Sequence, residues 1–143
     1  MRRGGTEMGV LNTRVLIEGT AQGPVLKLSE DISLWGGVDP LSSMIIDTRH
    51  PQHGRRISGK ILAMHRSIGS SSGSSILLEL MKHQRGPLGI ILIEADFIIT
   101  LGVLVAREMG LGEIPVVQIE ESVYPLLPDA AGIGLDGTLT ELP

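Results

Sequence analysis

A serine- and glycine-rich segment, residues 69–75 (the serine loop), is the strongest candidate for chemistry in this chain. It follows an apolar run and precedes apolar residues at helical spacing, so we expect it to open a helix. Backbone N–H groups and the dipole at a helix N-terminus favour an anion, and hydroxyls supply further donors. The same field eases formation of an alkoxide, so a serine at this place can act as a base or a nucleophile. A solvated turn that only caps the helix is an equally good interpretation.

Three other patterns resemble known sites, and we reject each of them. Residues 69–73 match the G-x-S-x-G turn of α/β-hydrolases, whose triad needs an acid and then a histidine farther along; only His83, near the end of the expected helix, follows. Residues 132–137 match the dinucleotide pattern G-x-G-x-x-G, but no helix can follow so close to the C-terminus. His50, His53 and His65 are more typical of turn histidines than of metal ligands.

Four single residues are candidates for contacts with a ligand or a partner, each with a structural alternative. Arg66, just before the serine loop, can pair with an anionic substrate or face solvent at a strand end. Asp39 can orient a ligand or hold its own turn through its carboxylate. His50 can shuttle protons or bond to the backbone of its turn. Trp35 can anchor an interface or belong to the core.

Short apolar runs separated by turns predict small strands in the first half of the chain. We expect these strands at residues 15–17, 25–28, 44–47 and 60–64, with a turn over residues 19–24. Residues 34–40 contain two adjacent glycines and an Asp-Pro pair, which indicate a special loop. Residues 1–12 are expected to form a flexible leader, which leaves residues 13–143 as a single domain.

The second half alternates between strand and helix periodicity. Helices are expected to begin at the serine loop, with Ser72 or Ser74 as cap, and over residues 97–109, with Asp96 as cap. Apolar strands are expected at residues 88–93 and 114–119, and one more strand at residues 137–142. Together with the strand at residues 60–64, this β-α-β-α-β order predicts an α/β fold with a parallel sheet and right-handed crossovers.

The composition excludes several classes of protein. The chain has 143 residues, a net charge of −4 and only three aromatic residues, Trp35, Phe97 and Tyr124, so neither a basic patch nor a base-stacking surface for nucleic acid is expected. Cysteine is absent, which excludes thiolate catalysis and an iron–sulfur cluster held by this chain's own cysteines. No apolar run reaches the ~20 residues that span a bilayer. We expect no membrane partner and a cytoplasmic location.

An ordered series of short blocks resembles the swivel domain, or small subunit, of aconitase X. The resemblance covers roughly residues 13–120, and its blocks are residues 34–40 (LWGGVDP), 45–51 (IIDTRHP), 59–62 (GKIL), 69–72 (GSSS), 102–106 (GVLVA) and 114–117 (IPVV). It implies the swivelling β/β/α domain of the aconitase superfamily, a hydro-lyase activity, and a large partner subunit, in a heterodimer or larger assembly. The iron–sulfur cluster would be carried by that partner, with none bound by this chain.

The same resemblance implies roles for the serine loop. The superfamily motif Gly-Ser-Ser-Arg-Glu makes the first serine after the glycine the proton-abstracting base, which is Ser70 here, and leaves Gly69, Ser71 and Ser72 to bind a small hydroxy-acid substrate. Ser72-Gly73 stands where the superfamily has Arg-Glu, which disfavours a tricarboxylic substrate such as citrate. Of the two substrates associated with the family, cis-3-hydroxy-L-proline is favoured over phosphomevalonate, because a phosphate would favour more cations near the loop. A non-catalytic anion-binding or structural subunit is the alternative.

Overall fold

The computed structural model describes residues 9–69 and 71–143, and it contains one eight-stranded mixed sheet in the order β1-β8-β7-β3-β4-β5-β6-β2. The strands are β1 (Val10–Leu11), β2 (Arg14–Ile17), β3 (Ala21–Lys27), β4 (Ile61–Met64), β5 (Gly89–Leu92), β6 (Val116–Gln118), β7 (Ala130–Ile133) and β8 (Leu139–Glu141). The helices are α1 (Leu34–Gly37), α2 (Gly73–Lys82) and α3 (Phe97–Glu108), with a 3-10 helix, η1 (Glu121–Leu126). In the described part of the chain, no helix is long and apolar enough to cross a membrane.

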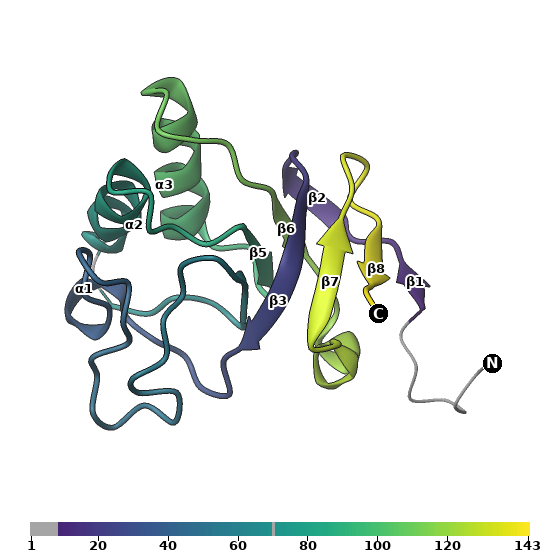
Figure 1. Cartoon of the computed structure of the whole chain (residues 1–143), viewed down its shortest axis with the longest axis horizontal. Helices are drawn as coiled ribbons and strands as arrows, with labels where there is room; N and C mark the ends of the chain where they lie inside the picture. The colour runs from purple at the N-terminus through teal and green to yellow at the C-terminus, as the bar shows by residue number, and fades with distance from the viewer. Residues whose placement is uncertain (1–8, 70) are drawn as a thin grey trace.

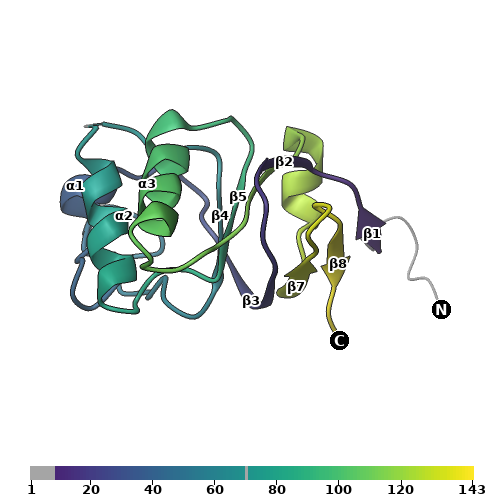
Figure 2. The same ribbon diagram turned by 90° about the horizontal axis from the view of Figure 1, so that it is seen from above.

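The predicted β-α-β-α-β order of the second half is confirmed. Strands β4, β5 and β6 are parallel neighbours, with Leu62 opposite Ile90 and Ile90 opposite Val116, and β3 joins them in parallel. Helices α2 and α3 lie together on one side of these strands, as Figures 1 and 2 show. Because both crossover helices begin where a parallel strand has just ended, their N-termini lie at the same edge of the sheet, the carboxyl edge.

The sheet curls so that its central strands are covered on both faces. Leu62 and Met64 of β4 belong to the apolar core under the helices, whereas Ile61 and Ala63 belong to a second core. This second core is completed by η1, β7 and β8, on the side away from the helices (Figure 2). Alternate residues of one strand therefore enter two cores, which explains why the strand is apolar throughout and gives the expected β/β/α layering.

The first half of the chain differs from the prediction at three places. The segment expected as a turn over residues 19–24 is extended from Ala21, because it pairs antiparallel with β7, which the sequence did not indicate. Residues 44–47 form single bridges, Val38 to Ile45 and Met44 to Arg56, rather than a strand. Residues 10 and 11, within the predicted leader, form β1 and pair with β8.

Tyr124 fastens η1 to the ends of two parallel strands. Its buried hydroxyl lies 2.6 Å from the carbonyl oxygen of Leu28 and 2.8 Å from that of Ala63, and burial raises the pKa of Tyr124, so that it remains a neutral donor. We expect Tyr124→Phe to lower the free energy of unfolding by about 1–2 kcal/mol, because the carbonyl oxygen of Leu28 loses its hydroxyl donor in a buried place, whereas that of Ala63 keeps its bond from Leu28 N. Urea unfolding measures this loss, and a midpoint equal to that of the wild type would contradict it.

Candidate functional site

Three loops meet at the carboxyl edge of the sheet. They follow β3, β4 and β5, and the last two lead into α2 and α3 (Figure 1). The loops after β3 and β4 are joined by a parallel bridge between Ile32 and Ser67 and by a hydrogen bond from Ile68 N to Ile32 O of 3.0 Å. The serine loop therefore follows a segment that is held on the neighbouring loop, at an edge where α/β sheets commonly bind ligands.

Gly69 is required by its surroundings at the start of the serine loop. Its φ is +88°, in the left-handed region, and a Cβ added to it would lie 2.8 Å from Ser33 Oγ. Ser33 is itself fixed, since its hydroxyl donates to the carbonyl oxygen of Trp35 at 3.0 Å. A side chain at Gly69 would thus face both backbone strain and a close contact, so a glycine here keeps the serine loop against the loop that follows β3.

The serine loop leads into α2 without a side-chain cap. Ser72 is the N-cap residue but its side chain makes no capping hydrogen bond, and no acidic residue lies in the first turn. Ser74 donates instead to Ile98 O at 2.8 Å, so of the two serines predicted as the cap, Ser72 occupies the N-cap position but makes no side-chain capping bond, and Ser74 does not cap the helix. Ser71 and Ser72 are exposed, and Ser70, the predicted base, lies outside the described residues. The start of α2 thus carries neither a carboxylate nor a hydroxyl cap, an arrangement compatible with an anionic ligand.

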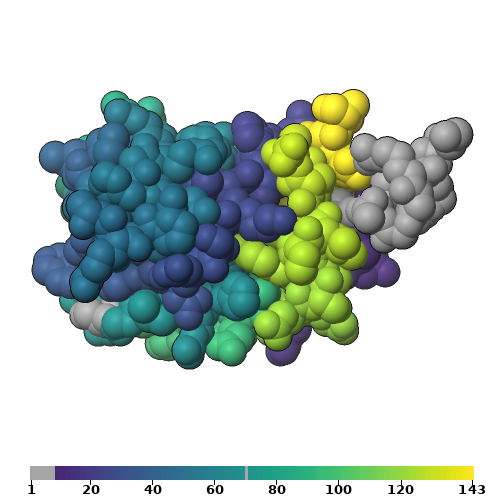
Figure 3. All heavy atoms as spheres, turned by 90° about the horizontal axis from the view of Figure 1, so that it is seen from below, coloured from purple at the N-terminus to yellow at the C-terminus, as the bar shows by residue number. Residues whose placement is uncertain are grey.

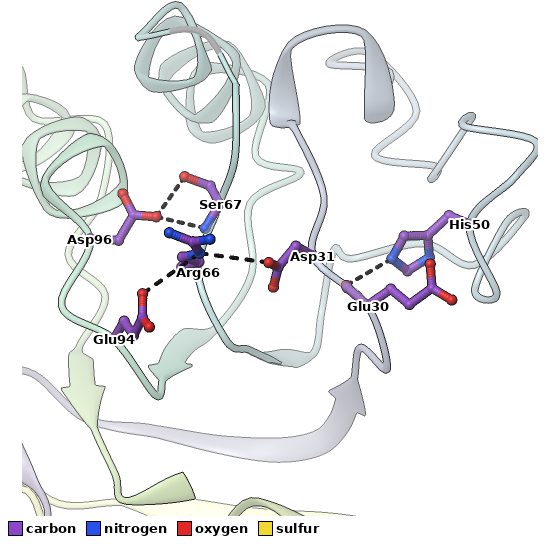
Figure 4. A network of polar contacts seen from close by, with 7 residues as sticks. All are labelled: Glu30, Asp31, His50, Arg66, Ser67, Glu94 and Asp96. Carbon is purple, nitrogen blue, oxygen red and sulfur yellow. Dashed lines mark hydrogen bonds and ion pairs between the residues drawn. The ribbon is translucent and has the colours of Figure 1, made fainter.

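Asp96 joins the loop after β4 to the start of α3. Its Oδ1 accepts from Ile98 N at 2.9 Å and Ile99 N at 3.1 Å, which confirms the predicted cap. Its Oδ2 accepts from both the backbone N and the hydroxyl of Ser67, each at 2.6 Å, a contact that the sequence did not predict (Figure 4). This buried carboxylate holds the residues that precede the serine loop.

We expect Asp96→Ala to lower the free energy of unfolding by about 2–3 kcal/mol, because it removes a helix cap and leaves the Ser67 donors without this acceptor in a partly buried place. Asp96→Asn should lose less, since one oxygen is retained. Asp136→Ala is the matched control: Asp136 is exposed and its carboxylate accepts from Thr138 N in a turn, so its loss should be much smaller. Equal urea midpoints for the Asp96→Ala and Asp136→Ala variants would contradict this role for Asp96.

The positive charge of Arg66 is already balanced by two acidic side chains. Its Nε lies 3.6 Å from a carboxylate oxygen of Asp31 and 3.6 Å from one of Glu94, as Figure 4 shows. The Arg66 side chain is 54% exposed, so these pairs are weak but still place negative charge beside its guanidinium. A substrate anion at Arg66 would have to compete with both carboxylates.

His50 and Asp39 have the contacts of their structural alternatives. His50 is buried, its Nδ1 accepts from Gln52 N at 3.0 Å, and its Nε2 lies 3.0 Å from Glu30 O (Figure 4). Both ring nitrogens are thus engaged with the backbone. Asp39 accepts from the Ser42 hydroxyl at 2.7 Å, which lowers the pKa of Asp39, and from a backbone N–H of the same turn. This geometry favours positioning roles for both residues.

The structure adds Arg49, which the sequence did not single out. A hollow of about 390 Å³ lies beside the loop after β3. Figure 3 shows that the chain between β3 and β4, in blue, forms much of one end of the face seen from below. Its lining combines small, apolar and charged residues: Ser33, Trp35, Gly36, Gly37, Ile46, Asp47, Thr48 and Arg49. Since a Cβ added to Gly69 would lie 2.8 Å from Ser33 Oγ, Ser33 is close to Gly69 and the hollow adjoins the serine loop. The only signal in the sequence was the place of Arg49 within residues 45–51.

The donor set of the chain does not fit an iron–sulfur cluster. The sequence has no cysteine, and among residues 9–69 and 71–143 no three histidine, aspartate or glutamate side chains gather to hold a metal ion. Any cluster at this site must be held by another polypeptide.

Comparison with known proteins identifies the family. Residues 10–141 match the family described as the aconitase X swivel domain. The chain belongs to this family. A crystal structure of Thermococcus kodakaraensis aconitase X in its holo-form is similar, with a TM-score of 0.82, 30% identity, and coverage of 94% of this chain and 98% of that one. The predicted resemblance to aconitase X and the predicted fold are thereby confirmed.

Two relatives of the aconitase X swivel domain have names that indicate a reaction. The cis-3-hydroxy-L-proline dehydratase of Pseudomonas aeruginosa is 43% identical over 108 residues, 76% of this chain, and this chain spans only 19% of its length. The phosphomevalonate dehydratase small subunit of Methanothermobacter thermautotrophicus is 36% identical over 127 residues, 88% of this chain and 92% of the relative. Both relatives are named dehydratases, the class that the sequence predicted.

Proposed function

We propose that this chain is the small subunit of an aconitase-X-type hydro-lyase that dehydrates a small hydroxy acid, and that cis-3-hydroxy-L-proline is its substrate. A large subunit would complete the enzyme and carry the iron–sulfur cluster. The observation that carries the proposal is Gly69, whose positive φ and closeness to Ser33 leave room for no side chain at the start of a serine loop that leads into a helix without a side-chain cap. The cytoplasmic location belongs to the same proposal.

In this proposal Ser70 is the base. Its Oγ, as an alkoxide, takes the proton from the carbon next to the substrate carboxylate. The electrons of that C–H bond form the carbon–carbon double bond, and the hydroxyl leaves from the neighbouring carbon. The hydroxyls of Ser71 and Ser72 and the N–H groups that open α2 would hold the carboxylate and the negative charge that develops on it. A serine is a weak base, so the site must be closed to water when the partner is present.

Charges near the serine loop support hydroxyproline. An imino acid carries one positive and one negative group, and the hollow beside the loop offers Asp47 and Arg49. A phosphorylated acid has only negative groups and would meet Asp47 and the two carboxylates around Arg66. The higher identity to the Pseudomonas dehydratase points the same way.

Phosphomevalonate is the second candidate substrate. Its support is the size of the relative from Methanothermobacter thermautotrophicus, a separate small subunit of which 92% aligns with this chain. The non-catalytic alternative is a subunit that binds an anion or the partner without taking part in the reaction.

An assay of the reconstituted two-subunit enzyme against both substrates tests the proposal. We expect dehydration of cis-3-hydroxy-L-proline and, at equal concentration, a kcat/KM for phosphomevalonate lower by about 100-fold or more, which corresponds to about 2.7 kcal/mol of discrimination. A preference for phosphomevalonate would show that the proposed substrate is wrong and that the proposed reaction, dehydration of a hydroxy acid, is right. No turnover of either compound by an assembled complex would favour the non-catalytic alternative.

A further inference from the structure

Two of the three aromatic side chains of this chain are exposed. Trp35 is 58% exposed and Phe97 is 78% exposed, whereas Tyr124 is buried. Apart from Tyr124 the core is aliphatic, and the other two aromatic side chains lie on the surface. Aromatic residues are enriched in the buried centres of protein interfaces, and exposed apolar groups of this size in a cluster mark an interaction surface.

Both aromatic residues are sequence neighbours of residues that pack near the start of α2. A Cβ added to Gly73 would lie 3.2 Å from Ile98 Cγ2 and 3.6 Å from Leu34 Cβ, so residues of both α3 and α1 lie close to this helix start. Phe97 precedes Ile98 and Trp35 follows Leu34 in the chain. The two aromatic residues therefore belong to the segments that pack near the end of the serine loop.

Two further exposed apolar side chains lie in the same region. Ile68 immediately precedes Gly69, and Ile46 lines the same hollow as Trp35. We call Trp35, Ile46, Ile68 and Phe97 the apolar rim. The rim residues lie on segments that adjoin the polar serine loop, and apolar side chains beside a polar site can exclude water from it when a partner covers them.

We propose that the apolar rim is the surface that docks onto the large, cluster-bearing subunit, with Trp35 and Phe97 as its anchors. This inference rests on the proposed function and adds the residues through which the partner is held. In the Pseudomonas relative the matched region is 19% of one long chain, so a domain of this kind has a much larger body to pack against. The partner must reach the serine loop to supply the cluster that this chain does not hold, and a body seated on the loop covers the rim.

The occupant is thus a polypeptide with apolar pockets for an indole and a phenyl ring, on either side of its own active-site opening. Burial of the rim also gives the dry environment that a serine base requires. Leu135 is an exposed apolar residue outside the rim and serves as the control. It is 64% exposed and lies in the turn between β7 and β8. These strands are on the side of the sheet away from α2 and α3 (Figure 1).

The test is the dissociation constant for the large subunit of the full small chain and of three variants, Trp35→Ser, Phe97→Ser and Leu135→Ser. We expect the first two to raise Kd by about tenfold or more and the third to leave it unchanged. All three residues are exposed, so circular dichroism and urea midpoints should match those of the wild type.

The outcomes separate the docking surface from the proposed function. Rim variants that bind the large subunit as tightly as the wild type would overturn the proposed docking surface. A Leu135→Ser variant that binds as weakly as the rim variants would also overturn it. In both cases turnover by the wild-type complex would still support the proposed function. A wild-type chain that does not bind the large subunit at all would overturn both.

Discussion

The Ser70→Ala variant, assembled with the large subunit, is expected to turn over its hydroxy acid about 10³-fold more slowly than the wild type, because a positioned general base contributes typically 10²–10⁴-fold. KM should change little, since the hydroxyl acts on the reacting carbon and the carboxylate is held by other groups. The measurement is kcat and KM at a large-subunit concentration that saturates assembly.

A control serine separates the base from serines in general. Ser122 is exposed in η1, in the layer away from the helices, and Ser122→Ala should retain kcat within about twofold, as surface substitutions usually do. Assembly of the Ser70→Ala variant is checked by its dissociation constant for the large subunit, which should equal that of the wild type. If the fully assembled Ser70→Ala variant has a kcat within about tenfold of the wild type, Ser70 is not the base.

The Gly69→Ala variant is also expected to lose turnover, by about 10–100-fold, although no reacting group is removed. The new methyl group would lie 2.8 Å from Ser33 Oγ and 3.2 Å from its Cβ, so the loop must move away from its neighbour. A displacement of about 1 Å at a catalytic group can lower a rate by 10²-fold. The left-handed φ adds about 1–2 kcal/mol of strain to the folded state.

Gly54 offers a matched control for backbone strain. Its φ is +89°, nearly that of Gly69, but a Cβ there would meet nothing within 4 Å. Gly54→Ala should therefore lose similar stability and keep its turnover. Combining Gly69→Ala with Ser33→Gly removes the contacting side chain and should restore part of the rate. Equal turnover by the Gly69→Ala and Gly54→Ala variants would show that the contact with Ser33 does not position the loop.

The parts of the fold that the sequence predicted depend on local signals. Helix α3 begins after an aspartate that caps it, and its apolar residues repeat at helical spacing, so both its start and its type follow from neighbouring residues. Strands β4, β5 and β6 are short apolar runs bounded by glycine, proline and polar residues, which is a strong local pattern. Their parallel order then follows from the helices between them.

The strands that were missed depend on distant partners. Strand β7 contains alanine and glycine, which have low strand propensity, and it is stabilised by pairing with residues 21–24 more than a hundred positions earlier. The same pairing extends β3 through Gly23-Pro24, which as an isolated dipeptide indicates a turn. Tertiary contacts outweigh local preference at both places.

The candidate site also has a part that local sequence predicts and a part that depends on distant residues. The serine loop and its glycine are contiguous, so their spacing could be recognised before the structure was known. The neighbours that determine its environment are not contiguous: Ser33 lies 36 residues before Gly69, Asp96 lies 29 residues after Ser67, and Arg66 meets Asp31 and Glu94 from two separate loops. Only folding could bring these groups together.

Complementation of the two subunits tests the central claim most directly. The purified small chain is titrated into purified large subunit, and dehydration of cis-3-hydroxy-L-proline is followed. We predict no turnover and no iron in the small chain alone, little turnover by the large subunit alone, and a rate that rises with added small chain until the subunits are matched. Full turnover by the large subunit without the small chain, or dehydration by the small chain alone, would contradict the account.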